Sequence, residues 1–213
     1  MATQAASQAP TTEQFRGAFH KELDALVEQV RDMGAGTHGA LERAMEAFAA
    51  EDVALCDTVI AGDDALDGRF AGIQREVLRL IARQAPVASD ARLLTAAMQI
   101  ALHLERIGDL AVNVAELTKR AAGLPRDPKV LRDLEEMGAT TLGMVDEAMR
   151  AFSDRDADAC LRLPLTDDRV DALNLARQLE RAGDHAVDIG EQVWFMVTGE
   201  LRELTSPARV RGE

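Results

Sequence analysis

Apolar residues recur along most of this chain at intervals of three and four positions, a spacing that places side chains on one face of an α-helix. A first series predicts an amphipathic helix of about 35 residues, with Thr11 or Thr12 as its N-cap. Its apolar positions are Phe15, Phe19, Leu23, Leu26, Val30, Met33, Leu41, Met45 and Phe48.

Two more helices follow with the same periodicity. The second extends from about Asp52 to Gln84, and Pro86 ends it. The third starts with Ser89 or Asp90 as its cap and reaches about Ala122, and two prolines then make residues 123–128 a linker. The inward positions are Val53, Cys56, Ile60, Leu66, Phe70, Ile73, Val77 and Leu80 in the second helix, and Leu94, Ala97, Ala101, Leu104, Ile107, Ala111 and Val114 in the third.

After the linker the same residues return at an offset of 104 positions. The matches begin at Met33-Gly34 with Met137-Gly138, and they continue through Thr37, Gly39, Met45, Phe48, Asp52, Cys56, Asp63, Asp64 and Asp67. So many coincidences at one offset indicate a duplicated unit, each copy a three-helix bundle. The sequence therefore predicts an all-α fold of six long helices in two tandem bundles.

Further along, the offset falls to 75, because Leu104-Glu-Arg-Ile-Gly-Asp109 matches Leu179-Glu-Arg-Ala-Gly-Asp184. The second copy is thus 29 residues shorter between Asp171 and Glu180. That stretch holds no Gly or Pro, so it offers no turn and would form one continuous helix. The alternative, which we favour, is that the tip of a helical hairpin that was not ordered is missing from these 213 residues.

The predicted organisation is a disordered tail over residues 1–11, a first bundle over 12–122, the linker, a second bundle over 129–203 and a tail over 204–213. No stretch of 18 apolar residues exists, so we expect no membrane insertion. The N-terminus lacks the features of a secretion signal. Cys56 and Cys160 fall in apolar helical patterns and are expected to be buried thiols in a cytoplasmic protein.

The charge balance narrows the possible partners. The 24 basic and 37 acidic side chains give a net charge of −13. A protein that binds the phosphate backbone of nucleic acid needs a positive surplus, so nucleic acid is excluded as a partner.

Four pairs of acidic residues stand four positions apart, where like charges destabilise a helix. A hairpin that turns near Val87 places the pair on the second helix level with the pair on the third. Each copy thus gathers four carboxylates, together with Asn113 in the first copy and its counterpart Asp188 in the second. The pairs are Asp63 and Asp67, Glu105 and Asp109, Asp167 and Asp171, and Glu180 and Asp184.

Several carboxylates gathered together are typical ligands for a hard or borderline cation. The alternative is a solvated acidic face, in which Arg106 and Arg181 neutralise the acids through salt bridges. His103 and His185 flank the two third-helix pairs, but they do not occupy matched positions, which argues against a shared ligand role. His20 and His38 are expected at the surface. Gly108 and Gly183, inside the predicted helices, indicate close approach by a neighbouring helix.

No motif of a known catalytic site occurs. The chain has no Glu-x-x-His of a ferritin-type oxidase, no Walker A loop, no His-Glu-x-x-His and no arrangement of a Ser or Cys nucleophile. No catalytic residue and no organic cofactor are predicted.

The two copies of Glu-Arg-x-Gly-Asp, at 105–109 and 180–184, together with Val59-Ile-Ala-Gly-Asp-Asp-Ala-Leu-Asp67, resemble the phosphate-uptake regulator family, PhoU. The resemblance covers about residues 12–203. Asp188 in place of Asn113, Pro164 early in the second copy's second helix and the 29-residue shortening depart from the pattern.

The resemblance implies a non-enzymatic cytoplasmic protein that represses the phosphate-starvation response. Its partners would be the ATPase subunit of the high-affinity phosphate transporter and a sensor histidine kinase, and it would form a homodimer. It also implies iron or zinc clusters held by the acidic motifs. The alternative function is a carboxylate-bundle protein that stores metal or uses it for redox chemistry, which metal-dependent oxidase turnover would support.

Overall fold

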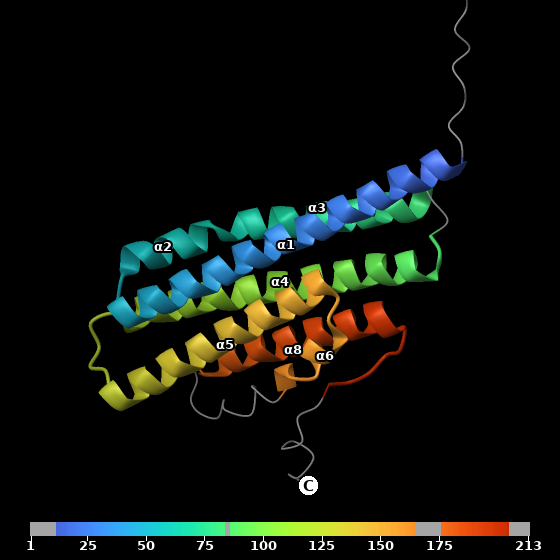
Figure 1. Cartoon of the computed structure of the whole chain (residues 1–213). Coiled ribbons are helices and arrows are strands. Elements are labelled where there is room, and N and C mark those ends of the chain that lie inside the picture. The colour runs from blue at the N-terminus through green and yellow to red at the C-terminus, as the bar shows by residue number, and fades with distance from the viewer. Residues whose placement is uncertain (1–11, 84–85, 165–175, 205–213) are drawn as a thin grey trace, which may run out of the picture.

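The computed structural model describes residues 12–83, 86–164 and 176–204, and every element in these ranges is an α-helix (Figure 1). The predicted all-α class with two tandem helical bundles is confirmed. Residues 165–175, which hold Asp167 and Asp171, lie outside the described residues, so the shortening of the second copy stays a prediction. No helix among the described residues has the length and apolar character needed to cross a membrane.

The first bundle contains α1 (Thr12–Ala50), α2 (Val53–Ala61), α3 (Asp63–Arg83) and α4 (Ala88–Ala121). The prediction of one helix from Asp52 to Gln84 was wrong, since Gly62 separates α2 from α3. The Gly62 N–H donates to the carbonyls of Thr58 and Val59, which ends α2. Val53 is 40% exposed rather than inward, because it lies in the first turn of α2.

The third predicted helix, α4, also starts earlier than expected. Val87 is its N-cap in an extended conformation, and its carbonyl accepts the first helical bond from Ala91 N–H at 2.9 Å. Ser89 and Asp90 therefore lie inside the first turn rather than at the cap. The predicted core face of α4 is correct, with Leu94, Leu104, Ile107 and Val114 fully buried.

The second bundle contains α5 (Pro128–Asp154), α6 (Ala157–Cys160) and α8 (Ala176–Thr198). Asp127 caps α5 and Pro128 is its first residue, so the linker ends one residue earlier than predicted.

The turn that precedes α6 repeats the one that precedes α2. Glu51 and Arg155, 104 positions apart, both have a positive φ, of 53° and 54°. The next residues, Asp52 and Asp156, both cap the following helix through their side chains.

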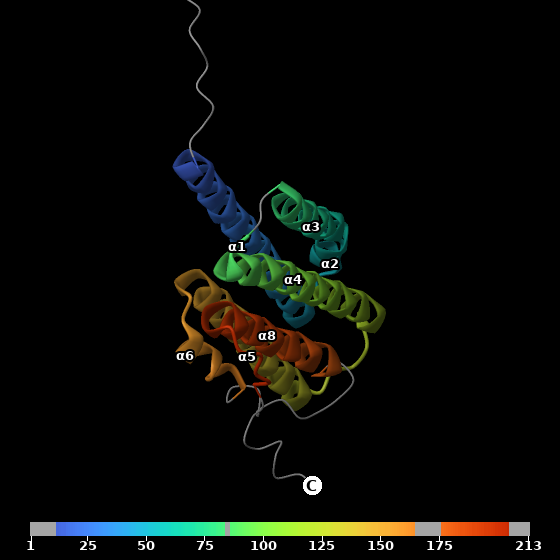
Figure 2. The same cartoon turned by 90° about the vertical axis from the view of Figure 1, so that its right-hand side faces the viewer.

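The two repeats pack face to face about an approximate twofold axis. Glycine on the first helix of each repeat contacts a methionine of the other, since Gly34 packs against Met149 and Gly138 against Met45. The helices α1, α4, α5 and α8 form the inner layer, each in contact with two of the others. Figure 2 shows α2 and α3 on one side of α4, and α5, α6 and α8 on the other.

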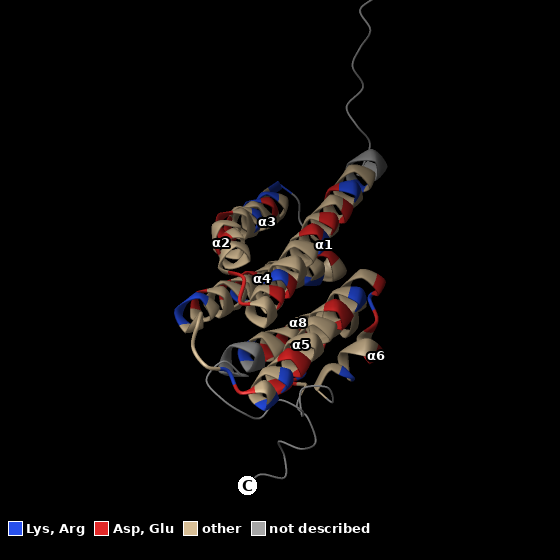
Figure 3. Cartoon of the chain, turned by 90° about the vertical axis from the view of Figure 1, so that its left-hand side faces the viewer, with Lys and Arg blue, Asp and Glu red and all other residues tan. Residues whose placement is uncertain are grey.

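The core runs through both repeats as one cluster of buried apolar side chains. Cys56 and Cys160 are buried in it as free thiols, as predicted. Charged residues lie along the outer sides of the helices, for example on α1 and α5 (Figure 3).

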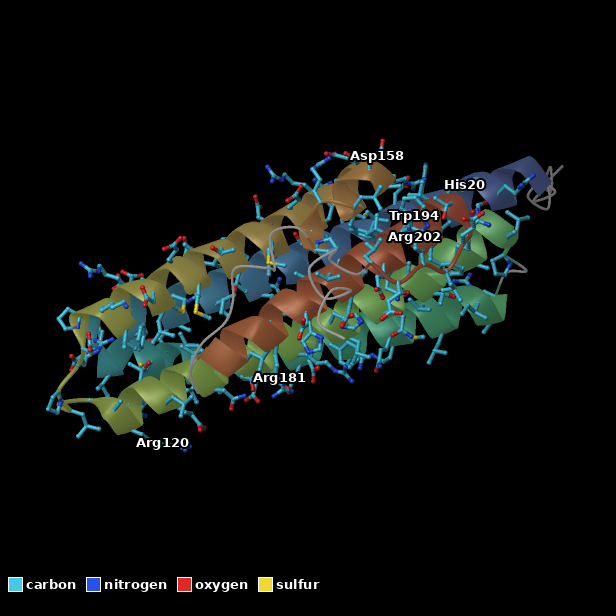
Figure 4. The ribbon with its side chains drawn as sticks, turned by 90° about the horizontal axis from the view of Figure 1, so that it is seen from below. His20, Arg120, Asp158, Arg181, Trp194 and Arg202 are labelled. Atoms are coloured by element: carbon cyan, nitrogen blue, oxygen red, sulfur yellow. The ribbon has the colours of Figure 1, made fainter. Side chains whose placement is uncertain are left out.

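The segment after α8 folds back along that helix. The Leu204 N–H donates to the carboxylate of Glu191 at 2.8 Å, and the Arg202 guanidinium lies 5.1 Å from the centre of the Trp194 ring (Figure 4).

Candidate functional site

A glycine in the Glu-Arg-x-Gly-Asp motif sets the distance between α3 and α4. Gly108 is buried, and a Cβ atom at this position would lie 2.8 Å from Cδ1 of Leu66 on α3. A side chain at position 108 would force the end of the Leu66 side chain to move, so the glycine allows Leu66 to pack closely against α4. The close approach predicted from Gly108 is therefore present, and it brings the acids beside Leu66 toward those beside Gly108.

The four carboxylates of the first repeat influence one another across this contact. Burial raises the pKa of Asp63, and the charges of Asp67 and Asp109 raise it further. Burial is also the main cause that raises the pKa of Glu105, followed by the charges of Asp109 and Asp67. Burial and Asp67 raise the pKa of Asp109 in the same way. The structure thus brings together the two pairs that the hairpin geometry predicted to lie level.

This acidic cluster, formed by Asp63, Asp67, Glu105 and Asp109, is more open than a metal site with its ion bound. Among the described residues, no three of these carboxylates place ligand atoms within 4.8 Å of one another. Arg106 forms no ion pair within 4.0 Å of any described carboxylate, although its charge lowers the pKa of Glu105 and Asp109. The donor set still fits a hard cation, whose charge would relieve the mutual repulsion.

The repulsion within the cluster predicts that Glu105→Gln stabilises the metal-free protein at pH 7 by about 0.2–0.5 kcal/mol. The folded-state pKa of Glu105 is raised, so folding favours its protonated form, and ionised Glu105 opposes folding. The gain should disappear as the pH falls through that pKa, because the wild-type residue is then also neutral. Urea unfolding at several pH values measures it, with Glu46→Gln on the exposed face of α1 as the control. Destabilisation by Glu105→Gln at pH 7 would contradict the prediction.

Less of the second repeat's predicted site can be placed. Asp167 and Asp171 lie outside the described residues, as does the side chain of Glu180. Asp184 is half-buried on α8 and lines a pocket of about 560 Å³ between α4 and α8. Arg106, Asp109 and the exposed Asn113 line the same pocket from α4. Figure 4 shows Arg181 on the side of α8 that borders α4.

The structure places Asp188 against two histidines of different repeats. Nδ1 of His103 on α4 lies 3.2 Å from Nδ1 of His185 on α8. Oδ2 of Asp188 lies 3.3 Å from the first nitrogen and 3.2 Å from the second. Among the described residues, only these three acidic, histidine or cysteine side chains form a group compact enough to hold one metal ion. The two histidines are therefore neighbours, although they do not occupy matched positions in the two repeats.

His103 and His185 come together because of the way α4 and α8 pack against each other. Arg92 Nε donates to the Met196 carbonyl at 3.3 Å, and eleven residues further along α4, His103 meets His185, eleven residues back along α8. The two helices are therefore antiparallel. A comparison of matched positions finds residues related by the duplication, whereas these histidines are neighbours because the repeats face each other.

We call His103, His185 and Asp188 the histidine cluster. Burial affects the pKa of two of its members, His103 and Asp188. The His103 side chain is 12% exposed, and burial lowers its pKa to about 4, helped by His185 and Arg106 and opposed by Asp188. The ring is thus neutral at pH 7. Burial alone would raise the pKa of Asp188, but the His185 hydrogen bond and the charges of both histidines and Arg106 lower it. Asp188 is therefore a carboxylate at neutral pH.

The sequence of this chain is similar to those of known proteins over most of its length. A family model described as the PhoU domain matches residues 30–118 and 134–176. The chain is 33% identical to the "Phosphate-specific transport system accessory protein PhoU homolog" of Caulobacter vibrioides (strain NA1000 / CB15N), across 92% of this chain and 95% of the relative. The protein of the same name in Rhizobium meliloti is 29% identical, across 85% and 88% of the two chains.

Solved structures give the same result for the fold. The crystal structure of PhoU from Pseudomonas aeruginosa matches with a TM-score of 0.80 and 29% identity, over 85% of this chain and 100% of that one. The phosphate transport system regulatory protein PhoU from Streptococcus pneumoniae, at 23% identity, has the same fold with a TM-score of 0.81, over 87% and 100%.

Proposed function

Since this chain belongs to the PhoU family, we propose that it is a non-enzymatic accessory protein of a phosphate transport system, acting in the cytoplasm. The observation that carries the proposal is the match of the PhoU domain to both repeats, combined with the relatives' printed name. The sequence supplies no nucleophile arrangement or nucleotide-binding loop, so the proposed role is binding rather than catalysis.

The finer proposal is that the protein represses phosphate uptake and the phosphate-starvation response as an adaptor. It would contact the ATPase subunit of the transporter and a sensor histidine kinase, and it would act as a homodimer. An adaptor without chemistry can change a partner only by binding one of its states more tightly than another. The net charge of −13 favours a basic docking face on each partner.

This proposal predicts that the tagged full-length protein retains the transporter ATPase and the kinase in pull-downs, in amounts that differ between high and low phosphate. Quantitative mass spectrometry of the eluates measures both partners. Retention that exceeds an untagged control at one phosphate level, and falls at the other, supports an adaptor role. If neither partner exceeds the control under either condition, the adaptor proposal fails.

We also propose that the acidic motifs bind iron or zinc in a structural or regulatory role. In the first repeat the ligands would be Asp63, Asp67, Glu105 and Asp109, with Asn113 beside them. The second repeat would use Asp167, Asp171, Glu180 and Asp184, with Asp188 beside them. The support is the gathering of four carboxylates, in which neighbouring negative charges help to raise the pKa of Asp63, Glu105 and Asp109, together with oxygen donors that suit such cations.

The metal proposal predicts that the double variant Asp109→Ala, Asp184→Ala binds less iron or zinc than the wild type. Removing one ligand from each cluster leaves too few oxygens for tight binding. Metal analysis after incubation and dialysis measures the content per chain. The control Asp24→Ala, Asp158→Ala removes the same charge from exposed positions on α1 and α6 and should keep the wild-type content. Equal content in both double variants would reduce the motifs to a solvated acidic face.

A further inference from the structure

The contact between α4 and α8 contains a second set of metal-ligand side chains, separate from the acidic cluster of α3 and α4. We propose that His103, His185 and Asp188 bind a zinc ion that links the two repeats. His103 comes from the first repeat, and His185 and Asp188 come from the second. An ion bound by all three would therefore hold the face-to-face packing of the repeats in place.

The distances between the three donor atoms match those of a zinc site. Zinc bonds to nitrogen and oxygen are about 2.0–2.1 Å long, so ligand atoms around a tetrahedral ion stand about 3.3–3.4 Å apart. The two Nδ1 atoms are 3.2 Å apart, and they lie 3.3 Å and 3.2 Å from Oδ2 of Asp188. All three edges of the triangle thus have nearly the length that one ion requires.

Hydrogen bonds alone satisfy this triangle poorly. If both Nδ1 atoms carry protons and donate to Asp188, the two N–H groups face each other at 3.2 Å. If only one carries a proton, the lone pair of the other faces the Asp188 carboxylate. A cation at the centre accepts a lone pair from all three atoms, and so removes the conflict in either arrangement.

The surroundings suit zinc better than magnesium or calcium. Two imidazoles and one carboxylate are a donor set that zinc accepts and that the harder cations avoid. The His103 side chain is only 12% exposed, and Oδ2 of Asp188 faces the Nδ1 atoms of both rings. Arg106 opposes a cation here, while Asp184 and Asp109 line the adjoining pocket with negative charge. His185 borders that pocket, which can supply water as a fourth ligand.

The duplication limits this site to one per chain. At the offset of 75, the positions equivalent to His103, His185 and Asp188 are Gln178, Leu110 and Asn113. Leucine has no ligand atom, and neither of the other two is a histidine. The chain therefore has a single place where imidazoles from both repeats meet, and we expect one zinc ion that depends on histidine.

Zinc titration of the metal-free full-length protein tests the proposal. The wild type should bind one more zinc equivalent than each of the variants His103→Asn, His185→Asn and Asp188→Asn. The last of these keeps the size of the side chain. The double variant His20→Asn, His38→Asn removes the other two histidines and should bind as the wild type does. Glu105→Gln, Asp109→Asn should keep the histidine-dependent equivalent, because it changes only the acidic cluster.

Two further measurements separate ligand loss from a folding defect. Without metal, the His103 and His185 variants should melt near the wild-type temperature, and zinc should raise the melting temperature of the wild type more than theirs. Cobalt should give a tetrahedral absorption spectrum in the wild type that these variants lose. If the wild type and the three ligand variants bind equal amounts of zinc with equal affinity, the proposal is overturned. A cobalt spectrum unchanged by His103→Asn would overturn it as well.

Discussion

Replacing Leu104 by alanine is expected to lower the free energy of unfolding by about 2–5 kcal/mol. Leu104 is fully buried on α4, in the core shared by both repeats. Its removal leaves a cavity that close-packed neighbours fill only in part. Its carbonyl also accepts a hydrogen bond from the buried hydroxyl of Thr37 on α1 at 3.2 Å, which restricts how far α4 can shift to fill the space.

Urea unfolding followed by far-ultraviolet circular dichroism measures the effect of Leu104→Ala. The matched control is Leu78→Ala on α3, where the side chain is 62% exposed and the change should stay within about 0.5 kcal/mol. Equal losses in the two variants would mean that α4 does not occupy the centre of the fold.

The variant Gly108→Leu should destabilise the protein by about 1–3 kcal/mol, because a large side chain at this position overlaps Leu66 and pushes α3 away from α4. The same shift separates the acids of α3 from those of α4. The pKa of Asp63 and of Glu105, each raised in part by charges on the other helix, should then move down toward the ordinary range. Carboxyl carbon shifts in an NMR pH titration report both groups.

The control for this variant is Gly68→Leu, at an exposed position of α3 where an added side chain meets open space. It introduces the same residue without overlap, and leucine is the better helix former, so stability should hold or rise. If Gly108→Leu is as stable as Gly68→Leu and leaves the pKa values unchanged, Gly108 does not set the distance between the helices.

The helices and the duplication could be predicted because both depend on local periodicity. Leu26 on α1, Ile73 on α3 and Leu94 on α4 each belong to a series of apolar residues at helical spacing, and each is buried as that spacing predicts. The division of the second helix was missed, because the sequence around Gly62 continues the apolar pattern on both sides. The break occurs where the Gly62 N–H donates to the carbonyls of Thr58 and Val59, and apolar periodicity does not record such a backbone arrangement.

The two halves of the candidate site differ in the same way. The proximity of the acids on α3 and α4 could be predicted from the sequence because both helices belong to one hairpin. The position of its turn determines which residues of the two helices lie level with each other. The proximity of His103 and His185 could not be predicted in this way, because their contact depends on how one repeat faces the other. His103 precedes Arg106 by three residues and His185 follows Arg181 by four, so antiparallel packing of the two motifs places the rings opposite each other.

The reciprocal contacts of Gly34 with Met149 and of Gly138 with Met45 are those of a symmetric dimer in which each subunit offers the same surface to the other. A fusion of two copies of one repeat would produce this pattern, because each copy keeps the surface through which it pairs with the other. In such a dimer every substitution occurs twice. Once both repeats belong to one chain, a histidine can be gained by one repeat and not by the other, so a binding site with different residues from each repeat can evolve.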